Sequence, residues 1–480
     1  MAESGPLFLG IDVGTQGARV LLADRAGAVV ASAADPFGPL AVGAKAHEQN
    51  PERWWSAVLD GVGRVVADVD PGRVDALCVT ATSGTLVVAD ESLRPLRPAL
   101  MWNDKRAAAE AREAARALAD PAMRPGFTVA KALWVRHHEP EVWARARWVL
   151  SAGDWLLARI TGQAPVTDPT NALKLGVDLE TLTWPTALEG LGVGLDRLPR
   201  VTATGTDLGA IGDAFAQATG LGSGTRVVLG ATDATAAQIA AGAVAEGSWV
   251  TTIGTGLSIK TVTSRRLSDP SGALYSHRHW DGGWIVSGTS HCGGDSLATR
   301  FPDGDWDALT AARTTPSSVL VLPLSTVGEY FPFRDAAATG FEVGDPDDRA
   351  DLFRGYLEGV AHVERLAVER IGELTGDLPG SVAGPQATMG GGARNDTWMR
   401  IRASVIGRPT TRTLTPTSAL GAAVLAAAPT LGGVTAAASA MVRVAATFDP
   451  EARRAAHADD THERFRGELS RRGYLQEALS

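Results

Sequence analysis

Two short segments of the chain run from apolar residues into a Gly-Thr turn and out again into apolar residues. The first turn, Gly14-Thr15-Gln16, closely follows Asp12, and the second, Gly254-Thr255-Gly256, lies in the second half of the chain. Each pattern predicts a β-hairpin with polar groups at its tip. Glycines bring backbone N–H groups close to an anion, and Asp12 could hold Mg²⁺. The two tips together predict phosphate binding by both halves of the chain.

A second acidic residue, Asp233, belongs to the segment Gly230-Ala231-Thr232-Asp233, which comes after an apolar run and before small residues of helical character. An Asp at such a place is most often a helix N-cap. It could also accept the proton of a substrate hydroxyl while that oxygen attacks a γ-phosphate. Asp12 and Asp233 are therefore the candidate catalytic residues, and both are candidate Mg²⁺ ligands.

A third segment, Gly390-Gly391-Gly392-Ala393-Arg394-Asn395, follows a predicted strand and precedes an amphipathic helix. Glycines let a base or ribose lie against the backbone, and the N-terminus of a helix favours negative charge. The segment lacks the G-x-G-x-x-G register of dinucleotide-binding folds, and a turn that packs two elements closely is the alternative. Because the chain has no Gly-Lys dipeptide, it has no P-loop.

Composition and charge limit the classes of protein to be considered. A chain of 480 residues is too long for one core, so two domains are expected. The net charge of -9 argues against a nucleic-acid partner, and the uncharged apolar run at residues 419–428 is shorter than the roughly 20 residues of a membrane span. Cys78 and Cys292 are the only cysteines, and no leader-like segment opens the chain. We therefore expect a cytoplasmic location without a membrane partner.

The elements that would position these motifs alternate between strands and helices. This alternation predicts an α/β fold, and we divide the chain into domains at residues 1–235 and 236–480. We expect strands within residues 7–33, 74–80, 226–230, 249–262, 284–288 and 319–322, and helices within 50–69, 233–243, 347–375 and 395–406. Residues 105–165 are expected to be mostly helical, 167–225 to be rich in loops, and the tail from residue 429 to be helical.

In order and spacing, these motifs resemble the FGGY family of carbohydrate kinases. The resemblance implies two actin-like, ribonuclease-H-like domains with a catalytic cleft between them, ATP and Mg²⁺ as cofactors, and Asp233 as the general base. The segments that carry it are Asp12-Val13-Gly14-Thr15, Asp154-Trp155-Leu156-Leu157, Thr167-Asp168, Gly230-Ala231-Thr232-Asp233, Gly254-Thr255-Gly256, Gly328-Glu329, Leu357-Glu358-Gly359-Val360, Gly390-Gly391-Gly392-Ala393-Arg394-Asn395 and Ala419-Leu420-Gly421-Ala422.

Carried over residue by residue, the resemblance also implies which residues contact each substrate. The sugar would contact Asp12, Ser83 and Asp233, in a pocket lined by Thr82, Trp102 and Asn103. The nucleotide would contact Gly14, Thr15, Gln16, Gly254, Thr255, Gly256, Gly391, Gly392 and Asn395.

The segment Thr82-Ser83-Gly84 bears on which sugar is used. Common bacterial xylulokinases have Met-His-Gly there and glycerol kinases an Arg-Glu pair, whereas this chain is similar to a branch that includes D-ribulose kinases. The resemblance thus predicts a pentulose kinase that converts D-ribulose to D-ribulose 5-phosphate, with D-xylulose as the second candidate. A non-catalytic actin-like ATPase is the remote alternative. Sugar and ATP are the expected partners, and the chain could also form a homodimer.

Overall fold

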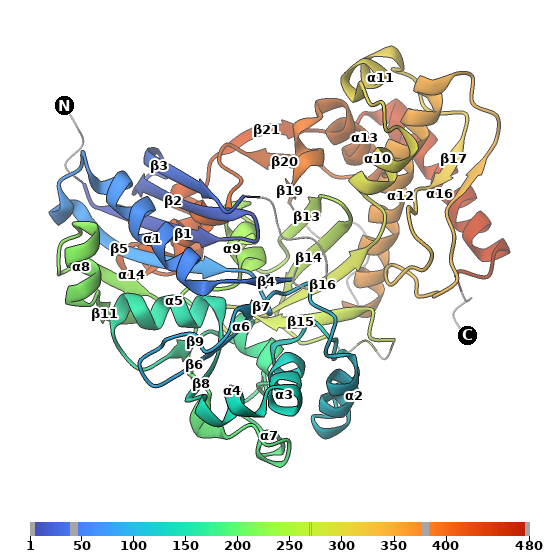
Figure 1. Cartoon of the computed structure of the whole chain (residues 1–480). Coiled ribbons are helices and arrows are strands. Elements are labelled where there is room, and N and C mark those ends of the chain that lie inside the picture. The colour runs from blue at the N-terminus through green and yellow to red at the C-terminus, as the bar shows by residue number, and fades with distance from the viewer. Residues whose placement is uncertain (1–4, 39–46, 268, 270, 376–383, 476–480) are drawn as a thin grey trace. The chain divides into compact units, whose positions relative to one another are not determined.

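The structure, a computed structural model, describes residues 5–38, 47–267, 269, 271–375 and 384–475, which fold into two compact units (Figure 1). The first unit comprises Met1–Val244 and Thr417–Arg443, and the second comprises Ala245–Pro416 and Val444–Ser480. The chain therefore passes from the first unit to the second, returns to the first, and enters the second unit again. The predicted cut between residues 235 and 236 falls inside helix α9 (Asp233–Ala240).

The first unit is built on a six-stranded mixed sheet with the order β11-β12-β5-β1-β2-β3. All seven residues of β1 are buried, because β1 pairs antiparallel with β2 and parallel with β5 and is covered on both faces. One face packs on α1 (Pro51–Val66) and the other on α14 (Ser418–Leu431). The strands are β1 (Leu7–Val13), β2 (Gly17–Asp24), β3 (Val29–Pro36), β5 (Val74–Ala81), β11 (Asp207–Ala210) and β12 (Arg226–Val228).

Helix α14 approaches its neighbours at two glycines. A Cβ at Gly10 of β1 would lie 1.9 Å from the Ala419 carbonyl oxygen, and a Cβ at Gly421 would lie 1.9 Å from the Ala236 carbonyl oxygen of α9. No other residue fits at either position, because real Cβ atoms essentially never come that close to backbone oxygen. In Figure 1 the orange α14 accordingly lies against the blue strands of the first sheet.

The rest of the first unit contains a small sheet and several helices. The predicted helical region 105–165 also contains a strand, β8, whose residues Val149, Leu150 and Ser151 are buried against β6. Periodicity alone did not separate this short apolar run from the helices around it. The elements here are β4 (Glu48–Gln49), β6 (Leu86–Ala89), β7 (Ala99–Leu100), β8 (Trp148–Ser151), β9 (Val166–Thr167), β10 (Arg200–Val201), α2 (Ala108–Ala117), α3 (Thr128–His138), α4 (Pro140–Arg145), α5 (Ala152–Thr161), α6 (Pro169–Ala172), α7 (Ala187–Gly190), α8 (Asp213–Thr219) and α15 (Val434–Met441).

The second unit repeats the plan of the first. In its seven-stranded sheet, ordered β15-β16-β14-β13-β19-β20-β21, an antiparallel hairpin again lies beside a parallel strand. The strands are β13 (Trp249–Ile253), β14 (Leu257–Thr263), β15 (Leu274–Arg278), β16 (Trp284–Ser290), β19 (Gln386–Met389), β20 (Thr410–Thr413) and β21 (Val444–Phe448), with a separate pair β17 (Leu320–Leu322) and β18 (Phe341–Val343); the helices are α10 (Gly294–Arg300), α11 (Trp306–Ala312), α12 (Arg349–Thr375), α13 (Asp396–Ile406) and α16 (Ala452–Arg471).

The expected helical tail is wrong in one respect. Pro429 lies inside α14, and β21 follows as a strand that pairs antiparallel with β20. Without β21 the backbone groups of β20 would form an open sheet edge, which natural proteins usually cover. The sequence pattern of so short a strand gives little warning of that pairing.

A buried ion pair joins two helices of the second unit to its sheet. Arg402 of α13 and Glu364 of α12 are both fully buried, and the guanidinium makes two contacts of 2.6 and 2.7 Å with the carboxylate. Thr251 of β13 donates to the same carboxylate, and Arg402 donates to Thr388 of β19. Paired and hydrogen-bonded in this way, both charges are compensated inside the core.

Across the described ranges, no single helix is long and apolar enough to cross a membrane, although the pair Ser418–Leu431 and Val434–Met441, bent by 117°, meets the length and composition test jointly.

We predict that His362 makes the second unit sensitive to acid. His362 is buried 3.3 Å from His462 (Nδ1 to Nδ1), and burial, together with the neighbouring His462, holds the pKa of His362 well below its usual range. Below about pH 6.5 the unfolded chain therefore takes up a proton that the folded unit refuses, so stability falls by up to about 1.4 kcal/mol per pH unit.

The His362→Phe variant should lose part of this slope, because Phe can stack on Phe465 as His362 does. Urea unfolding between pH 7.5 and pH 5 measures it. Replacement of exposed His138 by Phe is the control and should keep the wild-type slope, because His138 is not among the groups that shift the pKa of His362. Equal slopes for His362→Phe and the wild type would contradict the assignment.

Candidate active site

Asp12 lies near the end of β1, opposite Arg19 of β2 and Thr80 of β5. Its side chain is 6% exposed, and Arg19 Nη1 lies 3.4 Å from Oδ2. Among the described residues, the buried Oδ1 has no hydrogen-bond partner. Burial and then the negative charge of Asp233 raise the pKa of Asp12 to about 7, although Arg19 opposes them. The fold thus brings the two predicted catalytic carboxylates close enough to repel each other.

Strand order explains why these two residues meet. β12 and β1 both run parallel to β5 and flank it, so the segments that follow β12 and end β1 reach the same edge of the sheet. Thr80 of β5 donates a 2.7 Å hydrogen bond to the Ala231 carbonyl, and Ala81 forms an isolated bridge with Thr232. Asp233 then begins α9 as its first residue, after the N-cap Thr232.

A series of hydrogen bonds from buried side chains fixes the backbone just before Asp233. The Thr232 N–H donates to Thr170 Oγ1 (3.0 Å), and that hydroxyl donates to Asp168 Oδ1 (2.5 Å). Asp168 also accepts from Asn171 Nδ2 (2.6 Å). Ser418, at the start of α14, donates to the backbone carbonyl of Asp233. The position of Asp233 is therefore determined from two sides.

The turn at Thr82–Gly84 lies beyond the end of β5 and is held by two lysines. Thr82 Oγ1 and Thr85 Oγ1 are 2.7 Å apart. The Lys174 ammonium donates to the Ser83 carbonyl (3.1 Å), and the fully buried Lys131 donates to the Gly84 carbonyl. Lys174 also interacts electrostatically with Asp233. The Lys174 ammonium thus binds the Ser83 carbonyl and is also within electrostatic reach of Asp233.

Trp102 connects the predicted sugar pocket to the first phosphate hairpin. Its indole Nε1 donates to Thr15 Oγ1 (2.9 Å), while the residue as a whole is 47% exposed. The neighbouring Asn103 has a buried Oδ1 without a partner among the described residues. At the hairpin tip, Gly14 N–H closes the turn onto the Gly17 carbonyl, and Gln16 is exposed.

The second hairpin tip, Gly254–Gly256, is closed in the same way by a bond from Gly254 N–H to the Gly256 carbonyl. The carbonyls of Gly254 and Thr255 accept hydrogen bonds from the N–H groups of Gly294 and Asp295 at the start of α10. The tip is exposed, and among the described residues its Thr255 N–H donates to no backbone carbonyl.

In the third glycine segment, two glycines are closely packed and one is exposed. A Cβ at Gly390 would lie 2.3 Å from the Ile253 carbonyl oxygen, and one at Gly392 would lie 2.8 Å from Ile253 Cβ. Gly391 is exposed with open space around it. Asn395 caps α13 through Oδ1 and donates from Nδ2 to Thr310 (3.0 Å). Close packing therefore accounts for two glycines and a helix cap for Asn395, and their predicted nucleotide contacts stay predictions.

The motif search missed Lys131, Lys174 and Thr170 as contributors to this site. Each acts on a residue far away in the sequence, and only folding brings these pairs together. The rarity of lysine in an arginine-rich chain was the one signal that could have directed attention to the first two.

The donor set suits Mg²⁺ bound with phosphate. Across the residues described, no group of three or more His, Cys, Asp and Glu side chains could hold a metal by itself. Mg²⁺ commonly uses one or two carboxylates together with phosphate oxygens and water. The unsatisfied Oδ1 of Asp12 and the repulsion between Asp12 and Asp233 are what a divalent cation would relieve.

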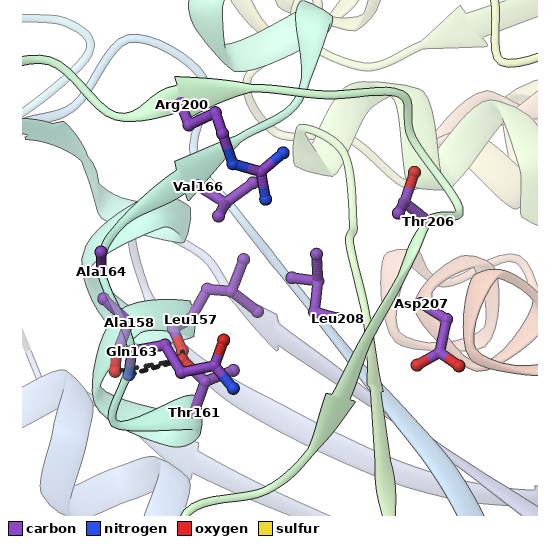
Figure 2. Close-up of a pocket in the computed structure, with 10 residues that line it drawn as sticks. All are labelled: Leu157, Ala158, Thr161, Gln163, Ala164, Val166, Arg200, Thr206, Asp207 and Leu208. Atoms are coloured by element: carbon purple, nitrogen blue, oxygen red, sulfur yellow. Dashed lines mark hydrogen bonds between the residues drawn. The ribbon is translucent and has the colours of Figure 1, made fainter.

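A hollow in the first unit lies away from these residues (Figure 2). It has a volume of about 190 Å³ and is lined from α5, β9 and β11, and the guanidinium of Arg200 points into it. None of the predicted site residues is among the described residues that line it. The candidate active site is therefore identified by chemistry rather than by cavity size.

Comparison with known proteins identifies the class. Residues 7–240 match the N-terminal domain of the FGGY family of carbohydrate kinases, and residues 250–429 match its C-terminal domain. The chain belongs to the FGGY family of carbohydrate kinases and is a carbohydrate kinase with the two-domain, actin-like α/β fold of that family. The predicted family and fold class are confirmed.

Relatives and solved structures agree with this assignment. The xylulose kinase of Escherichia coli (strain K12) is 29% identical over 421 residues, which cover 84% of this chain and 85% of that protein. The xylulose kinase of Bacillus subtilis (strain 168) is 25% identical over 468 residues, covering 92% and 93%. The structure of xylulose kinase from Rhodospirillum rubrum matches with a TM-score of 0.84 and 26% identity, covering 97% and 98%.

We predict that Asp12→Asn stabilises the protein in the absence of ligands. When folding raises the pKa of a carboxyl, the free energy of unfolding of the protein falls as pH rises from about 4 through 7. An amide side chain does not ionise, so the Asn variant avoids this loss. At pH 7.5 the variant should gain about 1 kcal/mol or more of unfolding free energy while losing activity. Denaturant unfolding of the ligand-free protein measures the gain.

Asp35 of β3 provides the matched control. The Arg53 guanidinium holds the pKa of Asp35 below its usual range, so Asp35→Asn should be neutral or destabilising. A loss of stability in Asp12→Asn at pH 7.5 would contradict the prediction, because it would show that the Asp12 carboxylate stabilises the fold.

Proposed function

We propose that this carbohydrate kinase is an ATP-dependent pentulose kinase that phosphorylates the terminal hydroxyl of D-xylulose. The observation that supports this substrate is the likeness, over more than four fifths of the chain, to proteins named xylulose kinase in Escherichia coli and Bacillus subtilis. This reverses the order in which the sequence motifs alone ranked D-ribulose and D-xylulose.

In the proposed mechanism, Asp233 accepts the proton of the sugar hydroxyl as its oxygen attacks the γ-phosphate. The hydrogen bonds from the Thr232 N–H to Thr170 Oγ1 and from the Ser418 hydroxyl to the Asp233 carbonyl hold the backbone that carries this carboxylate. Asp12, with its unsatisfied buried oxygen, would hold Mg²⁺, which supplies charge stabilisation on the phosphates.

The two hairpin tips would provide backbone N–H donors for the phosphates of ATP. Among the described residues, the N–H groups of Thr15, Gln16 and Thr255 have no backbone acceptor. Fixed backbone donors aimed at a charged phosphate need no reorganisation during the reaction. The two tips belong to different units, and each is proposed as a phosphate contact from within its own unit.

D-Ribulose is the second candidate, and one observation favours it. Thr82-Ser83-Gly84 occupies the place where common bacterial xylulokinases have Met-His-Gly, so the pocket lacks the imidazole of those enzymes. D-Ribulose and D-xylulose differ only in the configuration at C3, which means that a small change in the pocket can reverse the preference.

We predict that Asp233→Asn keeps the fold and ATP binding and lowers kcat about 10² to 10⁴-fold, because the amide cannot take a proton. ADP release with pentulose, together with ATP binding by calorimetry, gives the two readouts. Asp213→Asn is the control, since Asp213 is the first residue of α8 in the same unit and should retain wild-type turnover. Near wild-type turnover of Asp233→Asn would eliminate Asp233 as the base.

The substrate is tested with a panel of D-xylulose, D-ribulose, L-ribulose and glycerol in the same assay. We expect kcat/KM to be highest for D-xylulose, and ATP hydrolysis without sugar to be slow, because the acceptor hydroxyl is missing. A higher value for D-ribulose would establish the second candidate. Phosphorylation of only non-pentulose acceptors would contradict the pentulose proposal.

A further inference from the structure

Two lysines direct their ammonium groups at successive carbonyls of the turn Thr82–Gly84, although the chain uses arginine for most of its cations. Lys174 reaches the Ser83 carbonyl and Lys131 reaches the Gly84 carbonyl. A lysine ammonium has three N–H donors on a compact head, whereas a planar guanidinium needs a wider acceptor arrangement. The two lysines can therefore be compared donor by donor.

Lys131 has as many acceptors as donors. Its Nζ contacts three backbone carbonyl oxygens, those of Gly84, Leu100 and Met101. The side chain is fully buried. Every donor is satisfied by the protein, so Lys131 ties the turn to the segment before Trp102 and has nothing left to offer a ligand.

Lys174 has fewer hydrogen-bond acceptors than N–H donors. Among the described residues, the Ser83 carbonyl is its one hydrogen-bond acceptor, which leaves two N–H donors. The aliphatic part of Lys174 is packed against the turn: a Cβ at Gly84, whose φ is +89°, would lie 2.8 Å from Lys174 Cδ. The ammonium is thus partly buried with two N–H donors that lack an acceptor in the described structure. Such unsatisfied donors cost free energy unless a ligand accepts their hydrogen bonds.

The surroundings of Lys174 indicate what that partner is. The group interacts electrostatically with Asp233, the residue proposed to contact the reacting hydroxyl. The face of the Phe127 ring lies 5.9 Å from Nζ and offers no strong acceptor. A neutral oxygen next to the reacting hydroxyl could accept a hydrogen bond from the ammonium. It would add no further negative charge beside Asp12 and Asp233.

We propose that Lys174 is a substrate-binding residue that donates a hydrogen bond to a non-reacting hydroxyl of the ketopentose, at C3 or C4, while it holds Ser83 with another. This inference rests on the proposed pentulose kinase function and extends it to a residue that is not among the predicted substrate contacts. Since D-xylulose and D-ribulose differ at C3, contact with that hydroxyl would also make Lys174 a determinant of which pentulose is preferred.

Lys174→Met tests the proposal, with Lys174→Gln as a second variant in case the first does not fold. The KM for the pentulose should rise about tenfold to a hundredfold, which is the loss expected for one hydrogen bond to a charged group. The KM for ATP and the unfolding temperature should stay within error of the wild type. Lys105→Met, which removes an exposed lysine near Asn103, should leave all these values unchanged.

Deoxy analogues of the pentulose identify the contact. With either the 3-deoxy or the 4-deoxy sugar, the KM of Lys174→Met and of the wild type should become equal, because the partner hydroxyl is absent. The proposal is overturned if the variant keeps the wild-type KM for the pentulose. It is also overturned if the ratio of the two KM values is the same for the parent sugar and both analogues.

Lys131→Met shows what a purely structural effect looks like. Loss of three buried hydrogen bonds should lower the unfolding temperature of this variant by several degrees. If Lys174→Met behaves likewise, with stability, kcat and both KM values changing together, Lys174 is structural and the proposal fails.

The sugar specificity of the wild type distinguishes a failure of the Lys174 proposal from a failure of the proposed function. If it phosphorylates a sugar other than a pentulose, the proposed function fails and the Lys174 test is carried out on that sugar. If it phosphorylates no sugar, both fail.

Discussion

The burial of Asp12 beside Asp233 is the constraint around which the candidate site of the first unit is built. Ordinary cores avoid two neighbouring carboxylates, because neither charge is compensated and the pKa of one of them must rise. Here the fold enforces the pairing through the parallel strands β1 and β12 on either side of β5. The two carboxylates stay together despite this repulsion because many other contacts fix the surrounding backbone.

Those other contacts come from distant parts of the chain. Asp168 and Thr170 fix the backbone before Asp233, and Ser418 holds its carbonyl. The glycines at positions 10 and 421 let α14 approach both β1 and α9 at backbone distance. Short polar side chains and close packing of main chains therefore position Asp233, while two lysines hold the turn Thr82–Gly84. Such fixed positions suit a reaction that requires accurate alignment of two substrates.

The sequence predicted the parts of this site whose signals are local. The hairpin tips, Asp12 and Asp233 stand next to strand and helix patterns that can be recognised within about ten residues of sequence. Lys174 and Thr170 could not be found in this way, because their partners Ser83 and Thr232 are remote in the chain and only tertiary structure brings them together. The same reason applies to β21, a strand that depends on pairing with β20.

The return of residues 417–443 to the first unit affects how the protein is made. During synthesis, β1 and α9 leave the ribosome long before α14, so the face of β1 at Gly10 stays uncovered until most of the second unit has been translated. Folding of the first unit must therefore finish late, after its partner has begun. A gene fragment that ends after residue 244 would encode an incomplete core, and a circularly permuted chain that begins near residue 417 would supply α14 first.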